Sequence, residues 1–250
     1  MIVAIAVTAA LGIAMGAINN LAGGAGVLGL MAFEYLWHLP LAEANPSTRL
    51  AAIAIGSFAA LGFLRAGHRI PARAWLQALG AVPGALVGSQ LATALDDLVF
   101  RLYLTAVLVL LLIQQLWPRA TEVTPKPRPV WVSLLGCFLI GFHMGYAQVG
   151  TGLVATLVLV GLYDKNLVAV LAAKSAIVIA TSITSVAVFV SADAIVWPPA
   201  IALAVGCGAG SYLASHWGVK KGAGAIRRIV VVIAVLCLLD QLRHIVLALI

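Results

Sequence analysis

Long stretches with few or no charged residues are the feature that most limits what this chain can fold into. Several of them reach the ~17–25 residues that a helix needs to cross the hydrocarbon core of a bilayer. Charged residues make up 9% of the chain, whereas a typical globular protein has about a quarter. The sequence therefore predicts an all-α, polytopic integral membrane protein. The stretches are Ile2–Ile18, Ser47–Leu64, Trp75–Ala94, Val99–Trp117, Leu167–Val190 and Ile229–Leu239.

The basic residues gather in a few short loops. Eleven of the 15 Lys and Arg residues fall in segments 65–73, 117–130, 163–166 and 216–228. Cytoplasmic loops collect Lys and Arg, so these four segments are predicted to face inward. The same placement accounts for the net charge of +7 without a polyanionic partner. We therefore expect no nucleic-acid binding.

The second half of the chain repeats the pattern of the first about 126 residues later. Gly24-Ala25-Gly26 recurs as Gly150-Thr151-Gly152, and Gly80 and Gly84 recur as Gly206 and Gly210. The loop at 65–73 is basic, but its counterpart in the second half carries only Asp193. Matching loops would then lie on opposite sides of the bilayer. The sequence predicts two inverted repeats, 1–117 and 130–250, joined by a cytoplasmic linker at 118–129.

Each predicted repeat divides into five hydrophobic segments, of which the second is short. The first repeat has Ile2–Ile18, Gly26–Trp37, Ser47–Leu64, Trp75–Ala94 and Val99–Trp117, and the second has Val130–Tyr146, Gly152–Leu162, Leu167–Val190, Trp197–Ser215 and Ile229–Leu247. The two short segments extend only about 16–18 Å as helices, against a core of ~30 Å. We therefore expect each to be half of a broken or re-entrant hairpin with a glycine-rich tip.

The two predicted tips carry unusual polar residues for membrane segments. The first spans 19–26 and includes Asn19, Asn20 and Gly24, and the second spans 143–152 and includes Gln148, Gly150 and Thr151. Non-helical backbone at membrane depth is tolerated only where it is buried in protein or lines a wet cavity. A helix that restarts after such a tip points unpaired N–H groups at the cavity, which suits an anion. The alternative is that the glycines only allow helices to pack closely.

A cation stands near the start of the third segment in each half. Arg49 follows Asn45-Pro46-Ser47-Thr48, in which Asn is a candidate N-cap with Pro at the first helical position, and Lys174 is followed by Ser175. A charge at membrane depth usually marks a pathway or a buried pair. Arg49 and Lys174 are thus candidates for a shared anion site, with hydroxyls from Ser47, Thr48 and Ser175. Alternatively, Arg49 reaches the outer interface and Lys174 pairs with a carboxylate.

Two further titratable residues are candidates for proton coupling. His143 lies beside the second tip and Glu34 lies near the end of a short segment. A hydrogen-bonded core histidine and a hydrated glutamate are the alternatives. The three cysteines stand alone in apolar runs without metal-ligand spacing. The sequence therefore predicts no catalytic residue, no metal and no cofactor.

The repeated tip, Ser/Thr-containing helix start and glycine-stepped helix resemble the sulfite exporter TauE/SafE family. The stretches that carry the resemblance are Gly16–Gly29, Ala44–Leu50, Leu79–Ala92, Gly141–Leu157 and Ala204–Ala214. The resemblance implies transport of a sulfur-containing anion, such as sulfite or an organosulfonate, driven by an ion gradient. The Asn19-Asn20 pair, His143 and Gln148 depart from the family's pattern, which affects the expected substrate more than the fold.

The function predicted from these features is secondary transport of a small anion by alternating access, and not an enzymatic reaction. A passive anion channel and, less favoured, an integral-membrane enzyme are the alternatives. The expected partners are a small anionic substrate, the lipid bilayer and a coupling ion, either proton or sodium. A homodimer is a further option, and the resemblance implies the bacterial inner membrane.

Overall fold

The computed structural model describes residues 1–21, 25–94, 96–116, 130–147, 149–150, 159, 167–217 and 223–249. Within these ranges the chain forms ten α-helices and no strand. Apart from Leu159, the segment predicted at Gly152–Leu162 lies outside the described residues. The helices are α1 (Ile2–Leu21), α2 (Val27–Trp37), α3 (Leu41–Ser47), α4 (Arg49–Arg65), α5 (Ala72–Ala92), α6 (Asp97–Leu116), α7 (Val130–Tyr146), α9 (Leu167–Ser191), α10 (Trp197–Trp217) and α11 (Ala223–Leu249).

Five helical stretches of the described residues are long and apolar enough to cross a membrane, and α2 and α7 are shorter apolar helices. The five are Ile2–Asn19, Leu41–Arg65, Asp97–Gln114, Val170–Ser191 and Val230–Leu247. Large apolar side chains also cover the outside of the bundle, for example Leu76, Leu79 and Val205, each about two-thirds exposed. Such a surface is stable only in lipid. The prediction of a polytopic, all-α membrane protein is confirmed.

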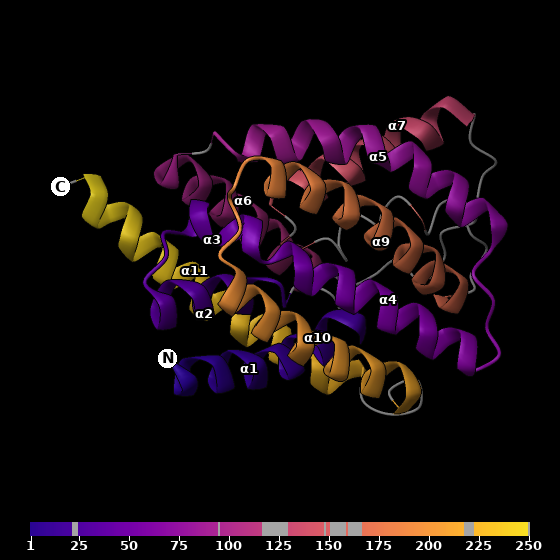
Figure 1. Ribbon diagram of the computed structural model, residues 1–250, viewed down its shortest axis with the longest axis horizontal. Coiled ribbons are helices and arrows are strands. Elements are labelled where there is room, and N and C mark those ends of the chain that lie inside the picture. The colour runs from indigo at the N-terminus through magenta and orange to yellow at the C-terminus, as the bar shows by residue number, and fades with distance from the viewer. Residues whose placement is uncertain are drawn as a thin grey trace.

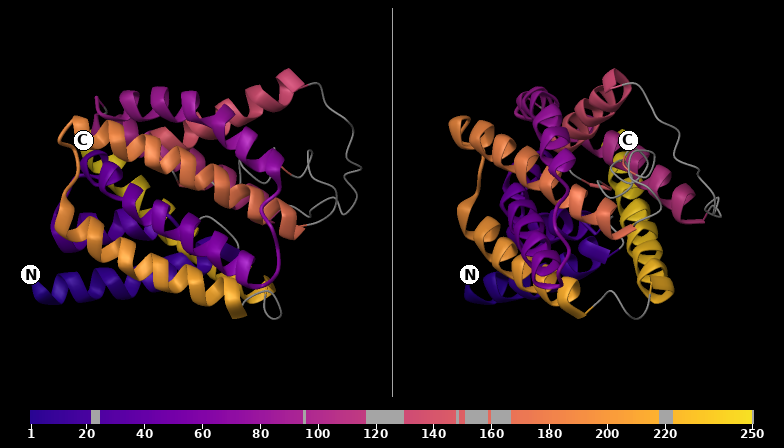
Figure 2. Two further views of the ribbon diagram at one scale, coloured as in Figure 1. Left: turned by 45° about the vertical axis from the view of Figure 1, so that its right-hand side comes forward. Right: turned by 90° about the vertical axis from the view of Figure 1, so that its right-hand side faces the viewer.

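Six helices form a continuous row through the bundle. Neighbours in the row pack in the order α7, α5, α9, α4, α10 and α1, with α4 and α9 in the middle (Figure 1). Helices α6 and α11 pack against each other on the side away from α9 and α10 (Figure 2). The first helix of each half packs on the helix of the fourth predicted segment in the other half: α7 packs on α5, and α1 packs on α10. Two-fold related repeats would produce this exchange.

Glycines allow the two outer pairs of this row to touch backbone to backbone. A Cβ on Gly84 would lie 2.1 Å from the Phe138 carbonyl oxygen of α7, and one on Gly210 would lie 2.0 Å from the Ile13 carbonyl oxygen of α1. Neither position has room for a methyl group. Small residues at helix spacing permit such close crossings in membrane proteins. The glycine steps of α5 and α10 therefore have the structural role that their spacing indicates.

The predicted helix start at Asn45 is wrong. Asn45 and Pro46 lie inside the short helix α3, and the chain breaks at Thr48 before α4 begins at Arg49. Thr48 flanks α4 without a side-chain cap, and Asn45 uses its amide elsewhere. The Asn45 oxygen that would cap a helix accepts from Arg49 instead, and its amide nitrogen donates to the Tyr146 carbonyl in the second half of the chain.

We expect cysteines introduced at His68 and Asp193 to react from opposite sides of the membrane. Both side chains are exposed in loops at helix ends, while the three native cysteines are buried. The measurement is labelling of intact cells with an impermeant maleimide, before and after permeabilisation. Arg69→Cys, in the same loop as His68, is the matched control and should label like His68→Cys. Labelling of positions 68 and 193 from one side would contradict the inverted repeat.

Candidate functional site

The side chain of Arg49 is fully buried in the bundle. Its Nη2 donates to the Asn45 Oδ1 atom at 2.8 Å and to the Gly145 carbonyl oxygen at 3.2 Å. The guanidinium also lies over the ring of Phe189 on α9, 5.6 Å from the ring centroid. Arg49 therefore joins α3, α7 and α9 at one point, and a positive charge sits where these helices meet.

The same point is the C-terminal end of α7. The last carbonyls of a helix lack partners within the helix and carry its negative dipole end. Arg49 takes the Gly145 carbonyl, and Asn45 Nδ2 donates to the Tyr146 carbonyl at 2.8 Å. Two side chains from the first half thus cap a helix of the second half. The capped residues lie within the tip predicted at 143–152, because α7 continues to Tyr146.

His143 lies in the last turn of α7 and is held at both ring nitrogens. Its Nδ1 lies 2.6 Å from the Tyr103 hydroxyl of α6, and its Nε2 lies 2.8 Å from the Val149 carbonyl oxygen. A carbonyl oxygen can only accept, so Nε2 carries a hydrogen. In the neutral ring Tyr103 must then donate to Nδ1. The edge of the Tyr103 ring also packs on Tyr146.

Three more predicted site residues lie close to this point. Ser47 accepts a hydrogen bond from the Val196 backbone N–H at 2.9 Å, and Thr48 donates to the Asn45 carbonyl at 2.7 Å. Both are buried. Gly150 is buried with φ +72, a conformation that side chains rarely adopt. The structure thus brings Ser47, Thr48 and Arg49 together with His143 in the last turn of α7.

Lys174 is not brought to this point. It lies half-buried on α9, and Ser175 donates to the Leu171 carbonyl within the same helix. Helices α4 and α9 run antiparallel, since Arg49 is near Phe189 while Phe63 packs with Ala172. Lys174 is about 22 Å along α9 from Phe189, from the rise of 1.5 Å per residue. The two predicted cations therefore lie towards opposite ends of one helix pair. None of the ion pairs among the described residues involves Lys174.

The first tip is described only in part. Asn19 lies half-buried in the last turns of α1, which continues to Leu21. The side chain of Asn20, and Gly24, Gln148 and Thr151, lie outside the described residues. Their predicted roles stay predictions.

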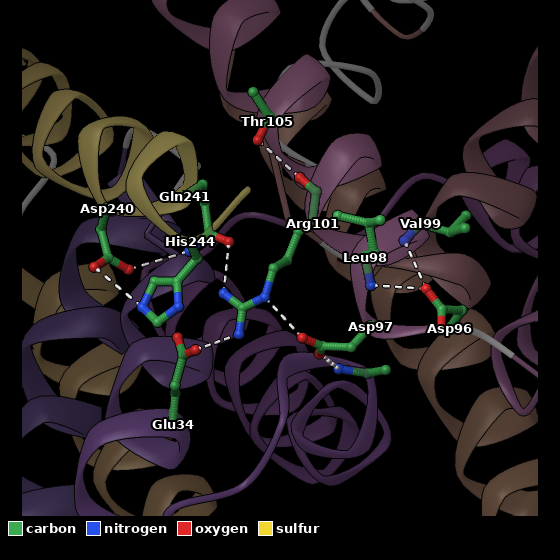
Figure 3. Close-up of polar contacts among 11 residues, drawn as sticks. Glu34, Asp96, Asp97, Leu98, Val99, Arg101, Thr105, Asp240, Gln241 and His244 are labelled. Atoms are coloured by element: carbon green, nitrogen blue, oxygen red, sulfur yellow. Dashed lines mark hydrogen bonds and ion pairs between the residues drawn. The ribbon is translucent and has the colours of Figure 1, made fainter. Parts of the chain in front are cut away.

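Glu34 belongs to a separate polar cluster. Its Oε1 accepts from Arg101 of α6, which also binds Asp97 at 2.7 Å and the Gln241 side chain at 3.1 Å (Figure 3). The Arg101–Asp97 pair has the i,i+4 spacing that favours a local ion pair. The other Glu34 oxygen, Oε2, is buried with no hydrogen bond within the described part of the chain.

Comparison with known proteins decides the family. The model of the family described as sulfite exporter TauE/SafE matches residues 8–240. The chain belongs to this family. A TauE/SafE protein is a membrane transporter, so this chain is a multi-pass membrane transporter and not an enzyme. The chain is also 26% identical over 223 residues to the "Probable membrane transporter protein ORF9" of a Sinorhizobium species, covering 88% of this chain and 85% of that protein. No solved structure gives a significant match.

Three residues of this TauE/SafE protein have contacts that the sequence did not indicate. They are Asn45, which caps α7, Tyr103, which binds His143, and Arg101, which binds Glu34 and Gln241. Arg101 gave a signal, because it is one of the few basic residues outside the four segments predicted to face inward. Asn45 and Tyr103 gave none, because their partners are distant in the sequence.

Proposed function

We propose that this TauE/SafE protein is a secondary transporter that moves a small sulfur-containing anion, sulfite or an organosulfonate, across the inner membrane. The observation that carries the proposal is the fully buried guanidinium of Arg49 at the end of α7. Ionisable groups inside membrane proteins usually serve a substrate path or a buried pair. Two of its acceptors are an amide and a carbonyl oxygen, which the oxygens of an anion can replace in a stronger, charge-assisted bond.

Lys174 provides a second positively charged binding site for the anion on the same helix pair, α4 and α9. An anion that travels between the two ends of α4 and α9 passes from one cation to the other. The proposed contacts around these two sites come from the hydroxyls of Ser47, Thr48 and Ser175, and from the predicted tip residues Asn19, Asn20, Gly24, Gln148, Gly150 and Thr151. The reciprocal packing of the helix row supports alternating access, in which repeat 1–117 moves against repeat 130–250 across the linker 118–129.

The coupling ion in this proposal is the proton, and His143 and Glu34 are its candidate carriers. His143 shares the last turn of α7 with Gly145, the carbonyl that Arg49 binds. An anion at Arg49 would favour a proton on the neighbouring imidazole through charge attraction. Glu34 is a candidate because its Oε2 atom is buried with no hydrogen bond within the described part of the chain.

We expect the purified protein in lipid vesicles to take up labelled sulfite or ethanesulfonate with a saturable rate. Lys174→Met should lower the initial rate about tenfold or more, because a charge-assisted hydrogen bond contributes roughly 1.5–3 kcal/mol. Arg73→Met, the same kind of change on an exposed loop residue, is the matched control and should transport normally.

Three outcomes of this experiment are informative. Unchanged flux in Lys174→Met would remove Lys174 from the anion path. Flux that neither saturates nor responds to a pH or sodium gradient would identify a passive channel. Uptake of neither anion above that of empty vesicles, in protein that is folded, would contradict the proposed function.

A further inference from the structure

Helix α6 carries two polar side chains, two residues apart, that reach different parts of the molecule. Arg101 binds Glu34 of α2, and Tyr103 binds His143 of α7. Helix α2 begins at Val27, directly after the first predicted tip, and α7 ends at Tyr146, within the second, which was predicted at 143–152. One helix therefore contacts an element adjoining each tip.

The first contact is a buried ion pair. The side chains of Arg101 and Glu34 are 9% and 11% exposed. Figure 3 shows the Arg101 guanidinium at the centre of its group, with Glu34, Asp97 and Gln241 around it. Removing one partner of such a pair leaves a buried charge, which is strongly unfavourable. The position of α2 is therefore tied to that of α6.

The second contact sets the orientation of the last turn of α7. The hydrogen bond from Tyr103 reaches Nδ1 of His143, while Nε2 holds the Val149 carbonyl beyond the helix end. The His143 carbonyl in turn accepts from the Ala147 N–H. A shift of Tyr103 would therefore move both the helix end and the chain that follows it.

The N-terminal end of α6 is anchored on two further elements. Arg101 binds Gln241 of α11, and Asp97 accepts from the Ala42 N–H of α3 at 3.0 Å. Residues 101 and 103 are only about 3 Å apart along a rigid helix. We infer that α6 couples α2 to the last turn of α7, with Arg101 and Tyr103 as the positioning residues. The functional meaning of this coupling rests on the proposed function.

Hydrogen exchange of the full-length protein in lipid nanodiscs tests the coupling without a transport assay. Glu34→Gln keeps a hydrogen bond to Arg101 but removes the charge, and Tyr103→Phe removes only a hydroxyl group. We expect each variant to raise exchange at least about fivefold both in α2 and in residues 143–147, a typical size for coupling between sites. The matched control is Leu102→Ala, a half-exposed apolar residue between the two, which should change neither region.

The backbone amides of α10 serve as a control for loss of stability in the whole protein, and their hydrogen exchange should be the same as in the wild type. If each variant raises exchange only at its own contact, or if α10 rises equally, the coupling is overturned. In transport, the Glu34→Gln/Tyr103→Phe double variant should be about as slow as the slower single variant, because coupled residues are not additive. If the variants show coupled exchange but the protein transports no anion, the proposed function is contradicted, whereas the coupling through α6 is still supported.

Discussion

Arg49→Gln will lower anion transport at least about 100-fold, since two bonds to a charged donor contribute roughly 1.5–3 kcal/mol each. The change removes the positive charge and also uncaps α7 at Gly145. Arg49→Lys keeps the charge on a single ammonium that has no planar fork. It should therefore recover part of the anion affinity while the maximal rate stays low. The measurement is the initial uptake rate in vesicles as a function of anion concentration.

The matched control for this change is Arg69→Gln, on an exposed loop arginine, which should leave uptake unchanged. The thermal midpoint of each purified variant separates loss of folding from loss of function. If Arg49→Gln folds and transports at the wild-type rate, the buried guanidinium has only a structural role. The proposed site would then have to be abandoned.

Gly84→Ala will lower the thermal midpoint by about 5–10 °C, which corresponds to an overpacking cost of roughly 1–3 kcal/mol or more. The added methyl group would lie 2.1 Å from the Phe138 carbonyl oxygen and 2.7 Å from the Phe142 nitrogen. Both are backbone atoms of α7, so no rotation of a side chain relieves the clash. Helices α5 and α7 must separate instead, which also displaces the end of α7 from Arg49. The measurement is thermal unfolding of the purified protein in detergent.

Gly80→Ala is the control for this effect, one helical turn earlier on the same face. Its added carbon would meet only the Leu134 Cδ2 atom at 3.2 Å and the Cys137 Cβ atom at 3.6 Å. Leu134 is exposed on the lipid side and can rotate away. We therefore expect its thermal midpoint to stay within about 2 °C of the wild-type value. Equal losses at both positions would show that the close helix crossing is not the cause.

The helices themselves were predictable to a large extent. The segment predicted at Val130–Tyr146 is helix α7 to the residue, and Leu167–Val190 differs from α9 only at its last residue. Both begin and end where apolar runs meet proline or polar residues. The prediction failed at Asn45, where the local pattern suits a helix start but the side chain caps another helix. Local rules could not foresee a partner about a hundred residues away.

The candidate site was predictable only in its separate parts. Arg49 and His143 were recognised by residue type and position, and the structure places both at the last turn of α7. The sequence placed Lys174 at the same point, but the antiparallel course of α4 and α9 carries it to the other end of the pair. Equivalent positions in a repeat need not meet, because symmetry relates them across an axis without bringing them together.

The sequence by itself determined that this chain is a helical membrane protein, because hydrophobicity and loop charge act locally and survive in any arrangement of the helices. It also determined which glycines would let helices touch. Only the tertiary structure decided that Asn45 and Arg49 bind the last carbonyls of α7. It also decided that Arg101 and Tyr103 of α6 bind α2 and α7, respectively. Hydrogen bonds and ion pairs are short-ranged and directional, so their partners become known only when distant segments are packed together.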